Sequence, residues 1–133
     1  MNQNEDHISV DIDITKEDFS RYNGEGTALK AAQMRLLEMM VEVDRICRQF
    51  NLTYWLDSGT LLGAVRHGGF IPWDDDFDIA ILREDHSHFI EVLRENLPSR
   101  YVVQDGSNEK YYHMPHARVV DTQSLIDYGG DQV

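Results

Sequence analysis

Four aspartates fall within one short stretch of the sequence, WDDDFDI. Side chains two residues apart share a face of an extended strand. We therefore expect Asp74, Asp76 and Asp78 to point to one side of a strand. Asp75 and Phe77 then point to the opposite side, where the apolar ring can be buried in a sheet.

The spacing of Asp76 and Asp78 favours a metal site. Their Cα atoms lie about 6.5–7 Å apart in a strand, and carboxylates this close raise each other's pKa unless a cation lies between them. Oxygen ligands of this kind suit Mg²⁺ or Mn²⁺. The alternative is a solvated acidic loop, which does not need apolar residues at the alternate positions.

A turn of small residues, Ser58, Gly59 and Thr60, lies between a strand predicted at 53–57 and a helix predicted at 61–67. A strand, small residues and a helix start bring free backbone N–H groups and the positive end of the helix dipole to one place. Gly59 lets a phosphate approach the backbone, and the two hydroxyls can donate to it. Taken alone, such a turn is more often an ordinary helix N-cap.

The turn and the aspartates together describe one site, in which the turn holds a phosphate chain and metals on Asp76 and Asp78 bridge it. Phosphoryl and nucleotidyl transfer need this arrangement, because metals neutralise charge and align the attacking oxygen with the leaving group. Arg66 can bind further phosphate oxygens in a fork. Trp73 can stack on a base or a choline group, with core packing as an equal alternative.

The run from Tyr54 to Ile79, YWLDSGTLLGAVRHGGFIPWDDDFDI, resembles the signature of LicD family proteins, the phosphocholine transferases of bacterial surface glycans. Eukaryotic fukutin-related ribitol-phosphate transferases carry a similar block. The resemblance extends back through residues 29–50 and forward through 84–97. It implies a nucleotidyltransferase-type fold, a CDP-activated donor, and transfer of its phospho-alcohol part to a sugar hydroxyl, with CMP released. The implied process is lipopolysaccharide or teichoic acid modification in cell envelope biogenesis.

The resemblance also assigns residues. Gly59 and Thr60 match the Gly-Ser/Thr turn of the superfamily, and Asp76 and Asp78 match its Asp-hydrophobic-Asp metal pair. Asp74 is a supporting carboxylate.

The superfamily carries a third carboxylate on a later strand, which in LicD relatives lies in an Ile-Asp-Ile-Phe-Pro-like segment that this sequence lacks. Asp121 and Asp127 are imperfect substitutes. We expect the true third acid to lie beyond Val133, where it would be the general base for the acceptor hydroxyl.

The elements that must position these residues alternate between helix and strand. Apolar residues at steps of three and four predict a helix over residues 27–50, with Thr27 as N-cap and Asn51 as a left-handed C-cap. A helix is also predicted over 84–97, ended by Pro98.

Strands are predicted at 74–82 and at 101–103, followed by a hairpin of residues 111–120 with residues 124–128. The expected fold is α/β (α+β), a nucleotidyltransferase-like mixed sheet flanked by helices. Residues 1–26 are expected to form an N-terminal arm with an edge strand, and residues 27–133 a core that is trimmed at its C-terminal end.

The amino-acid composition argues against some classes of function. The 133 residues suit one domain, and 24 acidic against 12 basic residues give a net charge of -12. This balance argues against nucleic acid as a partner, because few cations are present to neutralise its backbone. No apolar run is long enough to cross a membrane, although peripheral membrane association stays open. The single Cys47 cannot form an internal disulfide, which favours the cytoplasm.

The sequence therefore predicts a metal-dependent phospho-alcohol transferase with a CDP-activated donor and a glycan acceptor. One alternative is a nucleotidyltransferase that moves NMP to a protein or small molecule. The other is a non-catalytic fragment that binds nucleotide or metal.

Overall fold

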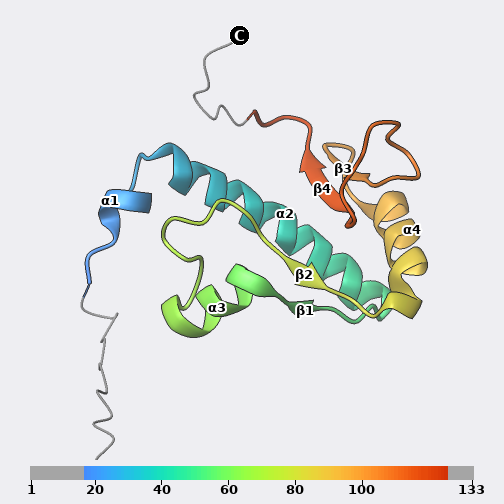
Figure 1. Cartoon of the computed structure of the whole chain (residues 1–133), viewed down its shortest axis with the longest axis horizontal. Helices are drawn as coiled ribbons and strands as arrows, with labels where there is room; N and C mark the ends of the chain where they lie inside the picture. Colours follow the sequence, from blue (N-terminus) through green and yellow to red (C-terminus); the bar gives the residue numbers. More distant parts are fainter. Residues whose placement is uncertain (1–16, 126–133) are drawn as a thin grey trace, which may run out of the picture.

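The computed structural model describes residues 17–125 of the chain. Helices and short antiparallel strands make up this part, which confirms the α+β class (Figure 1). The edge strand predicted in the N-terminal arm and Asp127 lie outside the described residues. The elements are α1 (Ser20–Asn23), α2 (Ala28–Phe50), β1 (Trp55–Leu56), α3 (Ser58–His67), β2 (Ile79–Ala80), the 3-10 turn η2 (Arg83–Asp85), α4 (His86–Asn96), β3 (Tyr101–Gln104) and β4 (Arg118–Asp121).

The ends of α2 lie where the sequence predicts them. The Thr27 side chain caps the N-terminus by accepting a hydrogen bond from the Lys30 N–H at 3.2 Å. At the C-terminus Asn51 is left-handed, with φ of 60°, and the Leu52 N–H donates to the Cys47 carbonyl. These contacts satisfy backbone groups that a helix end leaves without partners.

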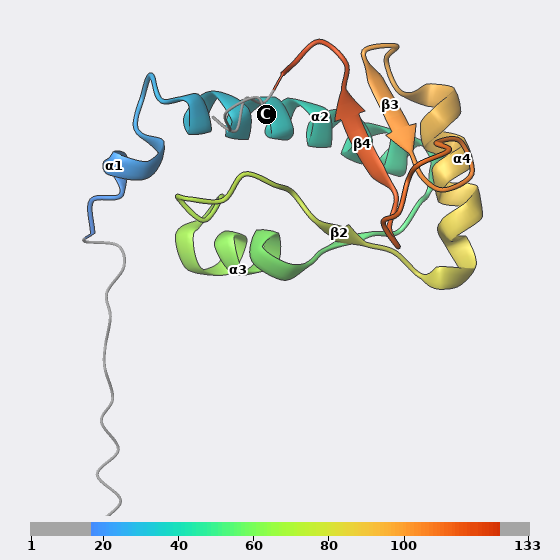
Figure 2. The same ribbon diagram turned by 45° about the horizontal axis from the view of Figure 1, so that its top comes forward.

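Helix α2 supports the rest of the described chain. The β1–α3–β2 segment runs along one side of it, and α4, β3 and β4 gather at its C-terminal part (Figures 1 and 2). The strands form two separate antiparallel ladders, β1 with β2 and β3 with β4. Both ladders are short, with two residue pairs in the first and four in the second. Two-stranded ladders of this length depend on packing against helices for their stability.

The hydrophobic core lies between α2, α4 and β3. Its centre is Ile46, which is fully buried. The Tyr54 hydroxyl, just before β1, donates to Asp44 of α2 at 2.8 Å and so connects the segment before β1 to this helix. Burial raises the pKa of the Cys47 thiol to about 11, with a further contribution from Asp44. A thiol with this pKa is not a nucleophile at neutral pH. The buried residues of this core are Val43, Ile46, Cys47, Phe89, Ile90, Val92, Leu93 and Val103.

Most of the second strand of the hairpin predicted from residues 111–120 and 124–128 lies outside the described residues. Within the described part β4 pairs with β3, with Tyr101 opposite Asp121. Arg100 fixes this register, because its guanidinium donates to both carboxylate oxygens of Asp121 at 3.1 and 2.6 Å. The ion pair holds the pKa of Asp121 well below its usual range.

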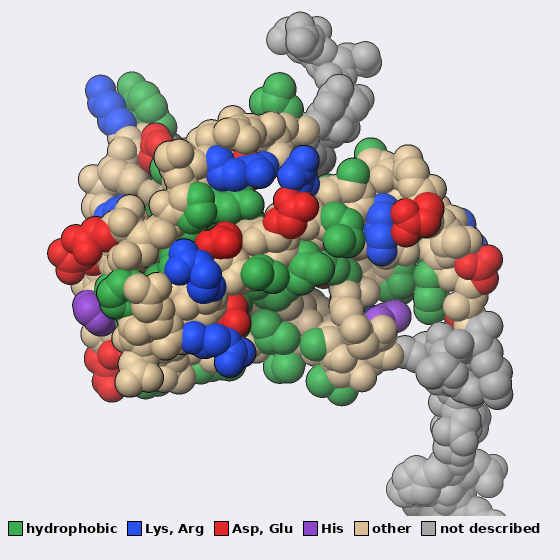
Figure 3. All heavy atoms as spheres, turned by 180° about the vertical axis from the view of Figure 1, so that it is seen from behind, with side chains coloured by type: hydrophobic (Ala, Val, Ile, Leu, Met, Phe, Trp, Pro, Cys, Tyr) green, Lys and Arg blue, Asp and Glu red, His purple; other side chains and the backbone are tan. Residues whose placement is uncertain are grey.

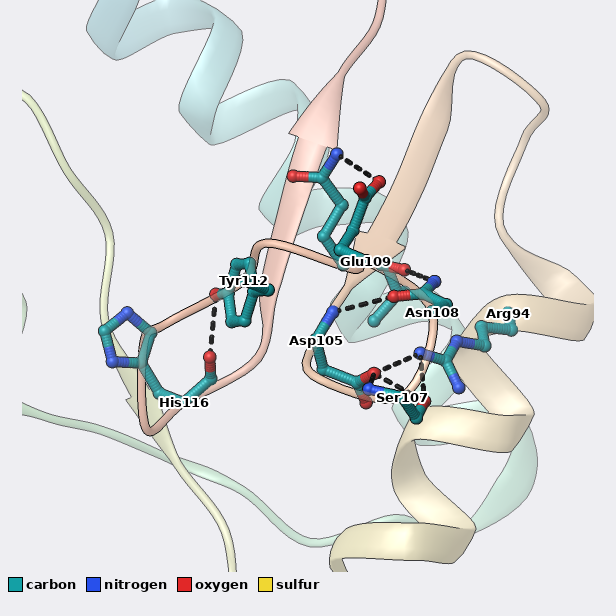
Figure 4. A network of polar contacts seen from close by, with 9 residues as sticks. Arg94, Asp105, Ser107, Asn108, Glu109, Tyr112 and His116 are labelled. Atoms are coloured by element: carbon teal, nitrogen blue, oxygen red, sulfur yellow. Dashed lines mark hydrogen bonds and ion pairs between the residues drawn. The ribbon is translucent and has the colours of Figure 1, made fainter.

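The connection from β3 to β4 is held by its own polar side chains (Figure 4). The Asp105 carboxylate accepts from the Ser107 N–H and from Arg94 of α4, at 2.8 and 2.9 Å. Asn108 reaches back to the Val103 carbonyl, and the Tyr112 hydroxyl donates to the His116 carbonyl. These contacts replace the strand that the sequence predicted between residues 111 and 117.

The surface seen from behind in Figure 3 mixes hydrophobic side chains with charged side chains of both signs. On α2 some of these charges form ion pairs one turn apart, such as Arg35 with Glu38 and Arg48 with Asp44. Among the helices within residues 17–125, none is both long and apolar enough to cross a membrane.

Helix α3 passes unusually close to the loop that returns from it. A Cβ at Gly63 would lie 2.5 Å from the Gly69 carbonyl oxygen and 2.8 Å from the Ile71 nitrogen. Both atoms belong to backbone, so no side chain can move away to make room. Only glycine lets the loop fold back tightly onto the helix at this point.

We predict that Gly63→Ala destabilises the protein by about 1–3 kcal/mol, because the added methyl group overpacks this contact. The gain in helix propensity, about 0.5–1 kcal/mol, is smaller. Urea denaturation measures the difference. Gly69→Ala is the matched control, because a Cβ there meets no atom within 4 Å, and an equal loss of stability in both variants would contradict the prediction.

Candidate functional site

The predicted phosphate turn and the aspartate segment are joined by two hydrogen bonds of the Asp78 backbone. The Asp57 N–H donates to the Asp78 carbonyl at 3.1 Å, continuing the β1–β2 ladder by one residue. The Asp78 N–H in turn donates to the Thr60 hydroxyl at 2.8 Å. Thr60 is buried, so this bond is shielded from water. The backbone of Asp78 is thereby fixed against the start of α3.

Gly59 makes the closest approach between the two parts of the site. A Cβ at this position would lie 2.8 Å from Oδ2 of Asp74. The absence of a side chain therefore lets the Asp74 carboxylate lie directly against the turn. Gly59 and Asp74, predicted from separate motifs, are neighbours in the structure.

The start of α3 offers free backbone N–H groups. The first N–H groups of a helix have no partner within it, and Asp57, at the N-cap, makes no capping hydrogen bond with its side chain. Ser58 has a left-handed backbone with φ of 49°, a conformation that costs free energy for a residue with a Cβ and is often found at functional sites. The turn is therefore suited to an anion rather than closed by its own cap.

Three carboxylates, those of Asp74, Asp75 and Asp76, each place an oxygen within 4.8 Å of the other two. The strand predicted over 74–82 is shorter than expected, since β2 begins at Ile79. Asp75 was expected on the opposite face, and this expectation is wrong. The reason is the turn before the aspartates, closed by the hydrogen bond from the Asp74 N–H to the Ile71 carbonyl, which leaves residues 74–78 irregular.

The negative charges around Asp76 change its acidity. Desolvation by its neighbours raises the pKa of Asp76, and the charges of Asp74, Asp78 and Asp75 raise it further. Asp78 is thus electrostatically coupled to the trio although it is not one of the three clustered carboxylates. A cation bound among these oxygens would favour the ionised form of Asp76.

Carboxylate oxygens alone form this cluster, which is the ligand type that Mg²⁺ and Mn²⁺ prefer. The close oxygens and the raised pKa of Asp76 both fit such an ion.

Two predicted ligand-binding residues make contacts with other side chains. Arg66 is exposed in the last turn of α3, about 10 Å along the helix axis from Gly59, and its Nε donates to Nδ1 of His67 at 3.4 Å. Trp73 packs edge-to-face against Tyr22 of α1, at 5.2 Å between ring centroids, and against Phe19 at 6.1 Å. Trp73 keeps half of its surface exposed, and stacking on a ligand stays a prediction for that face.

Asp121, one of the two candidates for a third carboxylate, has a structural role. Both of its oxygens bind Arg100, and Ser124 and the Gln123 N–H donate to them as well. A carboxylate with these partners is not free to bind a metal.

A cavity of about 530 Å³ adjoins the aspartates. Asp75, Asp76 and Asp78 line it together with His116 and Arg118. Apolar side chains, including those of α2 and α4, form much of the rest of its wall. The cavity therefore combines acidic, basic and apolar side chains beside the carboxylate cluster.

Residues 51–125 match the family described as "LicD/FKTN/FKRP, nucleotidyltransferase domain". The chain belongs to this family. The matched segment contains the turn and all four aspartates of the site.

Individual relatives agree with this assignment. The chain is 36% identical over 99 residues to the lipopolysaccharide cholinephosphotransferase LicD of Haemophilus influenzae, covering 74% of this chain and 37% of that protein. It is 48% identical over 60 residues to an uncharacterised protein of Rickettsia typhi, covering 45% of this chain and 19% of the relative. Human ribitol 5-phosphate transferase FKRP is 62% identical over 32 residues, which cover 24% of this chain and 6% of FKRP.

The chain thus spans well under half the length of the curated relatives it matches. No solved structure matches it.

Two residues near the turn and the aspartates were not among the residues predicted from the sequence. Asp75 was missed because period-two alternation was assumed through it. Gln33, which is 2% exposed on α2, was missed although a polar residue within an apolar helix face was a visible signal. Its amide contacts the loop that carries the aspartates.

We predict that Thr60→Val lowers the stability of this LicD-family protein by about 1–3 kcal/mol, because the Asp78 N–H loses its buried acceptor. Thr60→Ser is the control, since it keeps the hydroxyl. Urea denaturation compares the two variants. Equal stability of Thr60→Val and the wild type would show that the hydrogen bond between Thr60 and Asp78 contributes nothing.

We predict that Asp76→Asn stabilises the metal-free protein at neutral pH and abolishes any stabilisation by Mg²⁺. The raised pKa of Asp76 means that its ionised form is disfavoured by the fold. As the pH falls through the folded-state pKa of Asp76, the wild type becomes protonated there and its free energy of unfolding approaches that of the variant. Below the unfolded-state pKa of Asp76 the two proteins no longer differ in stability for this reason.

Thermal denaturation with and without Mg²⁺, at neutral and acidic pH, measures this effect. Glu91→Gln, on the exposed surface of α4, is the control for the loss of one negative charge. A lower melting temperature of metal-free Asp76→Asn at neutral pH would contradict the prediction.

Proposed function

We propose that the chain carries the donor-binding and metal-binding part of a phospho-alcohol transferase, which moves a phosphocholine-like group from a CDP-activated donor to a sugar hydroxyl of a cell-surface glycan. The observation that carries this proposal is the close approach of Gly59 to Asp74, because the turn, which is suited to an anion, lies directly beside the carboxylate cluster. Family membership and the 36% identity with a lipopolysaccharide cholinephosphotransferase support the type of reaction.

Each part of the site has a defined task in this proposal. The free N–H groups at the start of α3 and the hydroxyl of Ser58 bind the donor pyrophosphate. Asp74 and Asp76, with Asp78 beside them, would hold Mg²⁺ or Mn²⁺. When bound, the metal neutralises charge on the phosphates and helps to align the attacking oxygen with the leaving group. The chain's own contribution is to hold turn and carboxylates at fixed positions.

The cavity next to the aspartates supports a ligand with both polar and apolar parts. Arg118 and His116 are donors for the oxygens of a phosphate or a sugar, while the apolar wall suits the body of a nucleoside or alcohol group. We assign the donor to the turn and the cavity together.

We predict that the protein, incubated with Mg²⁺, CDP-choline and a glycan acceptor, releases CMP. The same incubation is made with the other CDP-alcohols. Asp76→Asn reduces the rate by at least about 100-fold, because one of the metal ligands is lost. Glu91→Gln keeps the wild-type rate. CMP is followed by chromatography, and the modified acceptor by mass spectrometry.

Transfer of labelled AMP or UMP to a protein or small molecule would favour a nucleotidyltransferase instead, because a different phosphorus would be attacked. Binding of CDP-alcohol and Mg²⁺ without turnover would favour the non-catalytic alternative.

A further inference from the structure

The side-chain amide of Gln33 makes three hydrogen bonds, and two of them bind the loop before the aspartates. Its Nε2 donates to the Asp74 carbonyl at 2.8 Å and to the Ile71 carbonyl at 3.3 Å. Its Oε1 accepts from Nδ2 of Asn23 at 2.9 Å. Gln33 is 2% exposed, so these bonds form away from water.

The two carbonyls that Gln33 binds are the two ends of one turn. The Asp74 N–H donates to the Ile71 carbonyl at 2.9 Å and closes that turn. The Ile71 side chain is itself buried at 8% exposure. The chain leaves this turn at Asp74 and enters the carboxylate cluster at once, so the position of the amide determines where the cluster begins.

The cluster needs such a support because its members repel one another. Residues 74–78 have no regular secondary structure of their own, and three carboxylates within 4.8 Å are driven apart when no cation is present. The C-terminal end of the segment is held through Asp78 by Thr60 and Asp57. Gln33 holds the N-terminal end, from a helix 38 to 41 residues earlier in the chain.

Helix α1 supports this orientation of the amide. The loop carbonyls can only accept, so they face Nε2 of Gln33, and Nδ2 of Asn23 donates to the remaining Oε1. The same helix packs Tyr22 against Trp73, next to the turn. Asn23 therefore links α1 to the position of the aspartates through Gln33.

We infer that Gln33, oriented by Asn23, is a positioning residue that holds the Asp74–Asp76 carboxylates in the arrangement that binds a divalent cation. The inference rests on the proposed function, because it requires that the cluster binds a metal. It assigns no contact between Gln33 and the metal. Its effect passes through the backbone of Asp74, as for other groups that orient metal ligands.

The test is a Mn²⁺ titration of the 133-residue protein, followed by the electron paramagnetic resonance signal of free Mn²⁺. Gln33→Met keeps the length and burial of the side chain but removes both donors. We expect it to raise the Kd for Mn²⁺ about 10-fold, the size of effect seen when a partner of metal ligands is lost. Asn23→Ala raises the Kd in the same direction by a smaller factor.

Ile46→Val is the control for a loss of stability on the same helix, because Ile46 is buried in the core and does not line the cavity beside the aspartates. It should lower the melting temperature and leave the Kd for Mn²⁺ unchanged. An equal rise of the Kd in Ile46→Val and Gln33→Met would overturn the inference, because general destabilisation would then explain both.

The remaining outcomes separate this inference from the proposed function. If the wild type binds Mn²⁺ and Gln33→Met binds it equally well, the inference is overturned and the metal site stands. If the wild type binds no Mn²⁺, both are overturned. If Gln33→Met does not fold, Asn23→Ala decides, and an unchanged Kd in that variant overturns the inference.

Discussion

The hydrogen bonds that fix Asp78 to the start of α3 are the constraint on which the candidate site depends. One comes from the Asp57 N–H and extends a ladder of only two residue pairs, and the other ends on the buried hydroxyl of Thr60. These two bonds hold the C-terminal end of the segment with four aspartates near the turn that carries Gly59. With them, Asp74 lies against Gly59, and groups suited to phosphate and to a metal share one site.

The crowded carboxylates of Asp74, Asp75 and Asp76 repel one another. Mutual repulsion and desolvation raise the pKa of Asp76, so the fold holds charges together against their own electrostatic preference. A protein with a net charge of -12 adds to this repulsion rather than relieving it. Electrostatic repulsion of this kind is typical of functional sites. The aspartates lie in the segment that matches the LicD family.

Helix α2 is the common support of the core and the site. Its C-terminal half buries Ile46 and Cys47 against α4 and β3, while Gln33 in its N-terminal half binds the loop before the aspartates. A single rigid helix therefore relates the position of the carboxylates to the packing of the core. The short helix α1 adds to this support through Asn23.

The sequence by itself determined the features that depend on neighbouring residues. Thr27 and Asn51 set the ends of α2 through local backbone preferences, and the glycine turn and the aspartates were recognisable as one site from their residue types. Only the tertiary structure decided that Asp75 joins the cluster and that β4 pairs with β3. The pairing of β4 with β3 depends on residues far apart in the chain, such as Arg100 with Asp121. The place of Asp75 depends on the turn before it, whose carbonyls bind Gln33 of α2. Period-two alternation carries no information about either contact.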